Sequence, residues 1–273
     1  MKVSVLTIGC RTNQSESQSI IREILTNGHQ LVDLKENPDF CVINTCAVTS
    51  KADSQSRQTI QKALRYANKV VVTGCFAHLN KSYIKGLDRI LLYDNNFKND
   101  IIKIFQEDSR VNSKDIKMNV SRPIIKVQEG CNDNCTYCSI INARGKSKSI
   151  HPKEIIDTVK QYVDEGYSEI VLSGTNIGQY GSDLSSKLDI YMLISEILSR
   201  TSIKKIRISS IEVKFVNDTL IELLKDERVC KHLHIPLQSG DNHVLRSMNR
   251  QYSIEEYYYR VNKVKEVIDN IAI

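Results

Sequence analysis

Three cysteines in one short stretch give this 273-residue sequence its clearest chemical signal. Cys131, Cys135 and Cys138 lie within GCNDNCTYC, and cysteine thiolates at such short spacings are typical ligands of zinc or of an iron–sulfur cluster. A closed site of either kind normally takes four protein ligands, and no fourth cysteine follows nearby. Either a fourth ligand comes from elsewhere in the chain, with His151 the nearest candidate for a zinc site, or one position stays open for a ligand that the protein does not supply.

Three further cysteines share one position relative to the expected strands. Cys10 follows VSVLTIG, Cys46 follows CVINT and Cys75 follows VVVTG. Because the carboxyl ends of parallel strands lie along one edge of a sheet, where ligands bind, we expect these thiols to converge. Taken singly, each would also suit a small buried side chain. The remaining pair, Cys41 and Cys230, lies within or beside expected strands and is expected to be structural.

The first hundred residues must position the dispersed cysteines, and they alternate between two patterns. Apolar runs predict strands at 3–8, within HQLVDL and DFCVINT, at 70–74 and at 89–94. Apolar residues at helical spacing predict helices over 15–28, with Gly28 at the C-terminal end, and over 51–67. Strand–helix alternation predicts a doubly wound parallel α/β domain over residues 1–106.

Residues 107–122 are polar, lack periodicity and precede Pro123, so we expect a linker there. Residues 123–273 form the second expected domain. Strands are expected in IIKVQEG, EIVLSG, IRISS and HLHIPLQ, and helices over 152–166, 188–199, 216–225 and 254–269. Repeated βα units of this length predict a (β/α) barrel. The sequence stops at NIAI, which reads as the start of a fifth strand, so we expect an incomplete barrel in a truncated chain rather than an open half-barrel.

The spacing C-x3-C-x2-C after a strand, with Tyr137 before the last cysteine, resembles the radical S-adenosylmethionine signature. The likeness then extends along essentially the whole chain. The segments GCRTNQSE, VINTCAVT, VTGC, EGCNDNCTYCSIINARGKSKS, LSGTNIGQYG, IRISSIE and HIPLQSGDNHVLRSMNR resemble those of the methylthiotransferase family, in the family's order. Members of that family continue beyond this endpoint with the rest of the barrel and a small RNA-binding β-barrel domain.

The resemblance implies two [4Fe–4S] clusters and S-adenosylmethionine. One cluster would be held by Cys131, Cys135 and Cys138, with its open iron binding S-adenosylmethionine, which yields a 5′-deoxyadenosyl radical on reduction. The other would be held by Cys10, Cys46 and Cys75 and would present the sulfur to be inserted. A second S-adenosylmethionine would supply the methyl group. No side chain is assigned a catalytic role, because the clusters carry the chemistry.

Two residues are assigned to the binding of S-adenosylmethionine itself, Tyr137 and Gly174. Gly174 opens a glycine-containing loop with Gly178 and Gly181, where the backbone could approach a cosubstrate, although plain turn duty would also explain the glycines. His232 and His234 fall on one face of an expected strand, as lining side chains rather than metal ligands.

The substrate follows from the same resemblance. The opening GCRTNQSE, with Glu16 after Asn13 and Gln14, is similar to the branch that modifies C2 of N6-threonylcarbamoyladenosine beside the anticodon of tRNA. Other branches act on isopentenyladenosine of tRNA or on an aspartate of a ribosomal protein. The partners expected are the tRNA anticodon loop and an electron donor such as flavodoxin or ferredoxin, with the enzyme a monomer.

Composition and charge agree with a cytoplasmic protein that meets an anionic partner. The net charge is +6, and Arg144, Lys146 and Lys148 form a basic run that would contact RNA phosphates or simply be solvated. No signal peptide or membrane-spanning run is recognised. Two readings of other kinds stay open, a zinc-stabilised RNA-binding module and an inactive remnant of a longer enzyme.

Overall fold

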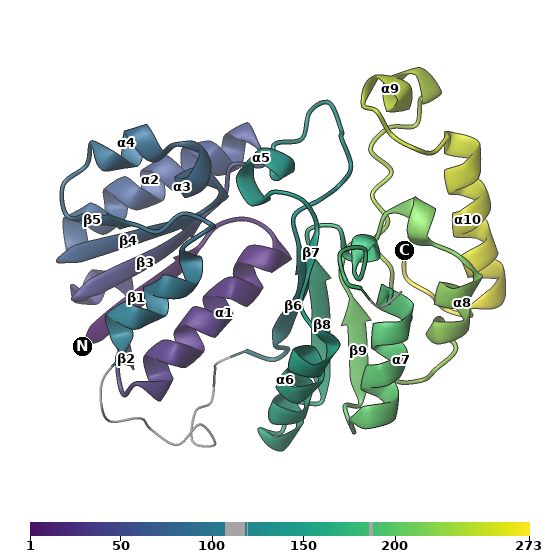
Figure 1. Ribbon diagram of the computed structural model, residues 1–273, viewed down its shortest axis with the longest axis horizontal. Coiled ribbons are helices and arrows are strands. Elements are labelled where there is room, and N and C mark those ends of the chain that lie inside the picture. Colours follow the sequence, from purple (N-terminus) through teal and green to yellow (C-terminus); the bar gives the residue numbers. More distant parts are fainter. Residues whose placement is uncertain (107–117, 119, 186–187) are drawn as a thin grey trace. The chain divides into compact units, whose positions relative to one another are not determined.

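The computed structural model describes residues 1–106, 118, 120–185 and 188–273 of the chain (Figure 1). The chain divides into two compact units. The first comprises Met1–Val120 together with the short segment Asn142–Arg144, and the second comprises Ser121–Ile141 and Gly145–Ile273. Most of the linker expected over 107–122 lies outside the described residues.

The first unit is built on a sheet of five parallel strands in the order β2-β1-β3-β4-β5. The strands are β1 (Lys2–Thr7), β2 (Gln30–Leu31), β3 (Phe40–Thr45), β4 (Lys69–Gly74) and β5 (Ile90–Leu92). The helices are α1 (Arg11–Thr26), α2 (Ser50–Tyr66), α3 (Cys75–Leu79) and α4 (Lys81–Lys85), with 3₁₀ segments η1 (Leu34–Glu36) and η2 (Lys98–Phe105). This arrangement confirms the doubly wound α/β fold.

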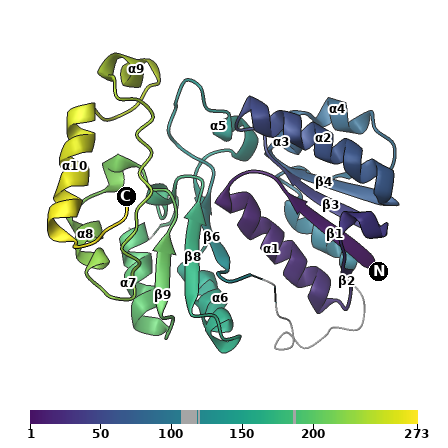
Figure 2. The same ribbon diagram turned by 180° about the vertical axis from the view of Figure 1, so that it is seen from behind.

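Both faces of this sheet are covered, as Figures 1 and 2 show. Val42 and Val71 pack with α1 and η2, while their neighbours Ile43, Val70 and Val72 pack with α2, α3 and α4. Successive side chains of a strand point to opposite faces. The apolar runs of β3 and β4 are therefore nearly continuous, as in strands buried on both sides.

Helix α1 begins at Arg11, four residues before the start that the sequence pattern predicts. The reason is that its first turns bury polar residues, which a search for apolar spacing does not register. The C-terminal end agrees with the prediction. Gly28, at φ +72°, donates to the Leu25 carbonyl, and the following N–H of His29 donates to the Ile24 carbonyl, which completes a Schellman motif.

The second unit carries a sheet in the order β7-β6-β8-β9, in which β6, β8 and β9 are parallel. The strands are β6 (Ile124–Glu129), β7 (Lys148–Ser149), β8 (Glu169–Gly174) and β9 (Lys205–Ile208). The helices are α6 (Pro152–Asp164), α7 (Ile190–Arg200), α8 (Asp218–Leu224), α9 (Asn242–Ser247) and α10 (Ile254–Val267), with 3₁₀ segments η4 (Ile177–Gln179) and η5 (Val213–Phe215). The short helix α5 (Ile140–Arg144) begins in this unit, and its last three residues belong to the first unit. The alternation of strands and helices is that of a partial (β/α) barrel.

The strand expected in HLHIPLQ is not a regular strand. This segment follows the parallel order through single bridges only, Ser210 with His234 and His232 with Ala272. Two features shorten the ladder: the N–H of His232 turns back to the Cys230 carbonyl, and Pro236 has no N–H to donate. The bridge at Ala272 shows that the segment expected to open a fifth strand does lie beside the fourth position.

Gly178 offers a direct test of packing in the second unit. A Cβ atom added there would lie 2.1 Å from the Phe215 ring, so Gly178→Ala should destabilise the unit by about 1–3 kcal/mol through overpacking and lower the midpoint of thermal unfolding. Combining it with Phe215→Leu should cost less than the two changes added together. Gly240→Ala is the matched control, because nothing lies within 4 Å of a Cβ there. Equal unfolding midpoints for the Gly178 and Gly240 variants would contradict the packing.

Candidate functional site

The first set of cysteines lies at the carboxyl edge of the five-stranded sheet. In the parallel register Thr7 pairs with Asn44, and Thr45 pairs with Gly74. The chain therefore leaves β1, β3 and β4 side by side, and each strand end is followed within three residues by one cysteine, namely Cys10, Cys46 and Cys75. The convergence expected from the sequence pattern is what the strand register produces.

Contacts around Cys46 show how close this set is. A Cβ atom on Gly9 would lie 2.7 Å from the Cys46 sulfur, so only glycine, at φ +105°, lets the backbone before Cys10 pass there. Burial raises the pKa of the Cys46 thiol, and repulsion from Cys75 and Cys10 adds to that rise. The three thiols thus lie within electrostatic range of one another.

Two side chains fix the backbone that carries these thiols. The amide of Asn13 donates to the carbonyls of Ile8, at 2.8 Å, and Thr45, at 3.0 Å, which ties the ends of β1 and β3 together. The hydroxyl of Ser56 accepts from the Cys46 N–H and donates to the Cys46 carbonyl. Cys10 also stands at the N-cap position of the 16-residue helix α1.

A buried ionic group lies beside the same edge within the first unit. The guanidinium of Arg144 donates to both carboxylate oxygens of Glu16, at 2.8 and 3.1 Å, and to Asn13 Oδ1 at 2.7 Å. Lys98 also pairs with Glu16. The Arg144 side chain is only 2% exposed, so the reading of Arg144 as part of a solvated or RNA-contacting basic run is wrong. Lys146 and Lys148 are exposed.

The second set of cysteines lies in the loop that follows β6, in the second unit. Gln128 anchors the loop by donating to the carbonyl of Gly130 and to Ser147 Oγ, both at 2.8 Å. The N–H of Cys131 donates to the Gly145 carbonyl. Cys138 follows one turn later, where its N–H donates to the Cys135 carbonyl. These hydrogen bonds therefore fix the three-cysteine loop at the carboxyl end of β6.

Cys131 is surrounded by a polar network that the sequence pattern did not reveal. Asn176 Nδ2 lies 3.6 Å from the Cys131 sulfur and donates to Asp133, which in turn accepts from Lys214 at 2.6 Å. Burial raises the pKa of the Cys131 thiol, and hydrogen bonds from the Asp133 N–H and from Asn176 oppose that rise. These contacts orient the sulfur.

Arg250 stands beside Cys135 in a similar way. It donates to Glu212 at 2.6 Å and to Tyr137 Oη at 2.8 Å, while Tyr137 Oη and Gln238 Oε1 lie 3.2 Å apart. Burial raises the pKa of the Cys135 thiol, and the positive charge of Arg250 opposes it. Tyr137 itself is 52% exposed. Tyr137, which lies within the cysteine loop, is therefore hydrogen-bonded to Arg250.

The glycines of the LSGTNIGQYG loop have packing roles. A Cβ atom would lie 2.8 Å from Gln128 Oε1 if placed on Gly174, and 1.9 Å from the Leu188 carbonyl oxygen if placed on Gly181. The Gln128 contact is part of the anchor of the cysteine loop. Close packing therefore accounts for the glycines at positions 174 and 181.

Several buried polar atoms at the carboxyl ends of β8 and β9 have no hydrogen-bond partner within the part of the chain that the structure describes. These atoms are Ser173 Oγ, Thr175 Oγ1, Asn176 Oδ1 and Ser209 Oγ; His232 Nδ1, in the segment that runs beside β9, likewise has no partner among the described residues. Buried polar groups are normally satisfied, so this set fits a polar ligand held at the end of the barrel strands. His234 differs, because it is exposed and bonded to Ser210 Oγ.

The zinc reading finds no support in the described residues. His151 caps α6, with Nδ1 accepting from the Lys153 N–H, and no three histidine, cysteine or acidic side chains there lie close enough to hold one metal ion. A four-iron cluster spreads its thiolates over different irons, so its ligands lie farther apart than those of a single ion. Cys41 is fully buried with a pKa raised to about 12, as expected of a core residue, and burial also raises the pKa of Cys230.

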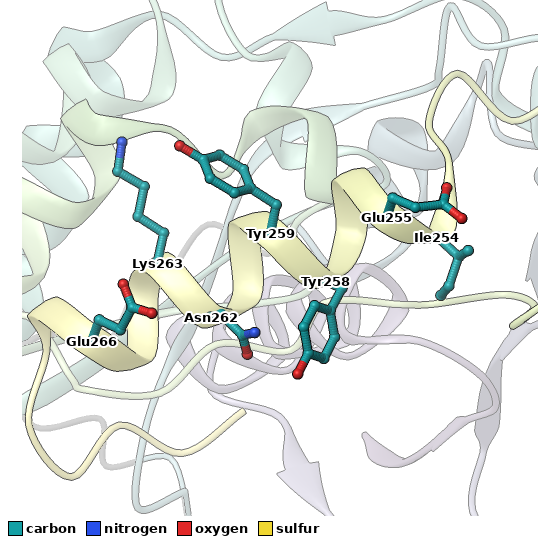
Figure 3. A pocket seen from close by; sticks show the side chains of 7 residues that line it. All are labelled: Ile254, Glu255, Tyr258, Tyr259, Asn262, Lys263 and Glu266. Atoms are coloured by element: carbon teal, nitrogen blue, oxygen red, sulfur yellow. The ribbon is translucent and has the colours of Figure 1, made fainter.

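Two surface pockets lie in the second unit. One runs along α10, where Tyr258 and Tyr259 project outward (Figure 3). The other lies between α7 and α8. Neither is lined by a cysteine. Among the described residues, no helix has the length and apolar character needed to cross a membrane.

Comparisons with known proteins agree with this geometry. Residues 125–273 match the Radical SAM superfamily, and residues 2–91 match Uncharacterized protein family UPF0004. The chain is similar to threonylcarbamoyladenosine tRNA methylthiotransferase MtaB of Aquifex aeolicus, with 36% identity over 97% of this chain and 70% of that protein. The Bacillus subtilis protein of the same name is also 36% identical, over 99% of this chain and 65% of that protein.

A relative with a different nucleoside in its name is nearly as similar. The tRNA-2-methylthio-N(6)-dimethylallyladenosine synthase of Clostridium botulinum is 31% identical, over 98% of this chain and 65% of that protein. The chain thus spans about two thirds of the length of these curated relatives.

Solved structures show the same fold at low sequence identity. The radical S-adenosylmethionine methyltransferase TsrM from Kitasatospora setae matches with a TM-score of 0.63 and 11% identity, over 97% of this chain and 67% of that one. The cobalamin-dependent S-adenosylmethionine radical enzyme OxsB matches with a TM-score of 0.60 and 11% identity, over 96% of this chain and 47% of that one. The fold, the cysteine loop after β6 and the relatives together show that this chain belongs to the radical S-adenosylmethionine tRNA methylthiotransferase family of enzymes, whose chemistry uses S-adenosylmethionine and a [4Fe–4S] cluster.

Proposed function

We propose that this chain inserts sulfur and a methyl group at C2 of N6-threonylcarbamoyladenosine beside the anticodon of tRNA. The observation that carries the proposal is that each unit places three cysteines at the carboxyl end of its parallel strands, after β1, β3 and β4 in the first unit and within the single loop after β6 in the second. Three thiolates leave one iron of a [4Fe–4S] cluster without a protein ligand. Two such sets fit a reaction that needs one cluster for S-adenosylmethionine and another for sulfur.

In this proposal Cys131, Cys135 and Cys138 hold the cluster that binds S-adenosylmethionine. When bound, this cofactor pair supplies a carbon-centred radical that takes hydrogen from the substrate. The protein's own part is to orient the thiols and to shield the site. The network of Asn176, Asp133 and Lys214 orients Cys131, and the unpartnered polar atoms at the ends of β8 and β9 suit the polar groups of S-adenosylmethionine.

Cys10, Cys46 and Cys75 hold the second cluster. Support comes from the strand register and from the mutual electrostatic effects of the thiols.

The choice of substrate rests on the curated relatives rather than on a residue that touches the nucleoside. Those named for threonylcarbamoyladenosine reach 36% identity, against 31% for the dimethylallyladenosine relative. The GCRTNQSE segment gives no independent support, because Asn13 and Glu16 are buried in the first unit and their side chains bind Arg144. A dimethylallyladenosine substrate is the second candidate, and it is favoured by that relative's coverage of nearly the whole chain.

Iron analysis tests the two cysteine sets. After anaerobic reconstitution we expect about eight irons and eight sulfides per chain, falling to about four in Cys131→Ala/Cys135→Ala/Cys138→Ala and likewise in Cys10→Ala/Cys46→Ala/Cys75→Ala. Cys230→Ala, which removes a half-buried thiol outside both sets, is the control and should keep all the iron. Loss of all iron from either triple variant would show that the sets do not hold separate clusters, and zinc without iron would remove the radical mechanism.

Nucleoside analysis tests the substrate. We expect a bacterial strain without tRNA methylthiotransferases to regain 2-methylthio-N6-threonylcarbamoyladenosine when it expresses this chain, as measured by mass spectrometry of digested tRNA. Cys135→Ala should abolish the product, because the open cluster loses a ligand, while Cys230→Ala should retain it. A methylthiolated dimethylallyladenosine instead would assign the chain to the other branch. The absence of both products from an iron-loaded chain would contradict the proposed activity.

A further inference from the structure

The buried ionic group of the first unit has a place in the fold that invites a functional reading. Glu16 lies in the second turn of α1, which starts directly after Cys10, and Asn13 lies between them. The Cys10 sulfur lies 3.9 Å from Asn13 Oδ1, the same atom that accepts from Arg144 at 2.7 Å. Asn13 Oδ1 therefore lies between the Cys10 thiol and the Arg144 guanidinium.

The orientation of Asn13 is fixed on all sides. Its Nδ2 atom donates to two strand-end carbonyls, those of Ile8 and Thr45, so Oδ1 is left to face the guanidinium of Arg144. The main-chain carbonyl of Asn13 accepts from Asn44 Nδ2. Both asparagines are fully buried. Arg144 is thus held against a framework made from the same strand ends that carry the cysteines.

Charge in this group is costly to bury, which makes a purely structural reason for it weak. Taking an arginine and a carboxylate out of water carries a large desolvation penalty, and replacing a buried ion pair by apolar residues is often neutral or stabilising. Here two cations, Arg144 and Lys98, meet on the single carboxylate of Glu16. Burial lowers the pKa of Arg144, but Glu16 overcomes that effect and raises the pKa well above its usual value, with smaller contributions from Cys75 and Cys10; Arg144 in turn lowers the pKa of Cys46 against the effect of burial.

We propose that Arg144 is a positioning and charge-balancing residue for the cluster held by Cys10, Cys46 and Cys75. The bidentate pair with Glu16 and the bond to Asn13 hold its guanidinium at the sheet edge, where a fixed positive charge compensates the thiolates. A positive charge next to a cluster stabilises the more reduced, more negative state, so Arg144 raises the reduction potential of that cluster, and Glu16 lowers it. The inference rests on the proposed function, because it assumes the cluster.

The test isolates one cluster and reads its potential rather than the activity. The background is the full chain with Cys131→Ala/Cys135→Ala/Cys138→Ala, reconstituted anaerobically and titrated with dithionite while reduction is followed by electron paramagnetic resonance. Arg144→Met should shift the midpoint potential to more negative values. Arg144→Lys keeps the charge but not the bidentate geometry and should shift it less. Glu16→Gln should shift it in the opposite direction, to more positive values.

Arg89→Met is the matched control, because it removes one positive charge from the same unit at the opposite edge of the sheet. Arg89 is exposed and donates to carbonyls at the end of α2, next to the start of β5. The midpoint potential of the Arg89→Met variant should equal that of the background chain.

Equal potentials for Arg144→Met and the control would overturn the proposal, and so would shifts of Arg144→Met and Glu16→Gln in the same direction, since a merely structural role would disturb the site alike in both. If Arg144→Met fails to fold by circular dichroism, the opposite signs expected for Glu16→Gln and Arg144→Lys still decide the question. Failure of the proposed function looks different, because a background chain without iron would disprove the cluster itself before any potential is measured.

Discussion

Parallel pairing of β1, β3 and β4 is the constraint on which the first unit depends. Three cysteines that are far apart in the sequence become neighbours only because these strands are adjacent and end at one level. The backbone at that level has little room, as the passage of Gly9 over the Cys46 sulfur shows. The apolar runs that bury the strands on both faces therefore also set the geometry of the thiols.

Polar side chains fix the backbone around both sets of cysteines. Asn13 donates to the carbonyls at two strand ends, and Ser56 hydrogen-bonds to the backbone of Cys46. Glu16 forms ion pairs with Lys98 and Arg144 beside the same edge of the sheet. In the second unit, Gln128 and Asn176 hydrogen-bond to the cysteine loop after β6 and to its surroundings. In both units polar side chains fix the backbone next to the cysteines. Such networks specify a single geometry only when their members are all satisfied.

Much of this fold follows from patterns in the sequence, and the exceptions have physical causes. Continuous apolar runs identify β1, β3, β4, β6, β8 and β9, and the positions of the six cysteines after strands could be read from those runs alone. Apolar spacing does not indicate the start of α1, because the buried residues of its first turns are polar. The apolar pattern of HLHIPLQ predicts a strand, but Pro236 and His232 limit its pairing. Short α3, α4, α5 and α9 have too few turns for apolar spacing to appear.

The site networks were beyond such reasoning for a different reason. Arg144 looks like one member of a solvated basic run, and only the contact with Glu16, far away in the sequence, shows that it is buried. The same holds for Arg250, whose partners Glu212 and Tyr137 come from other segments. Pairing of charges across the chain leaves no local pattern to recognise.

The dispersed origin of the first thiol set has a consequence for biosynthesis. Non-local strand pairing forms slowly, because the entropy of closing long loops opposes it. A nascent chain has no complete set until β4 has docked beside β3, and Arg144 leaves the ribosome later than all three thiols. In the proposed function, a cluster at this site would therefore be assembled on a first unit whose sheet has already formed, and the charge of Arg144 would join the site last.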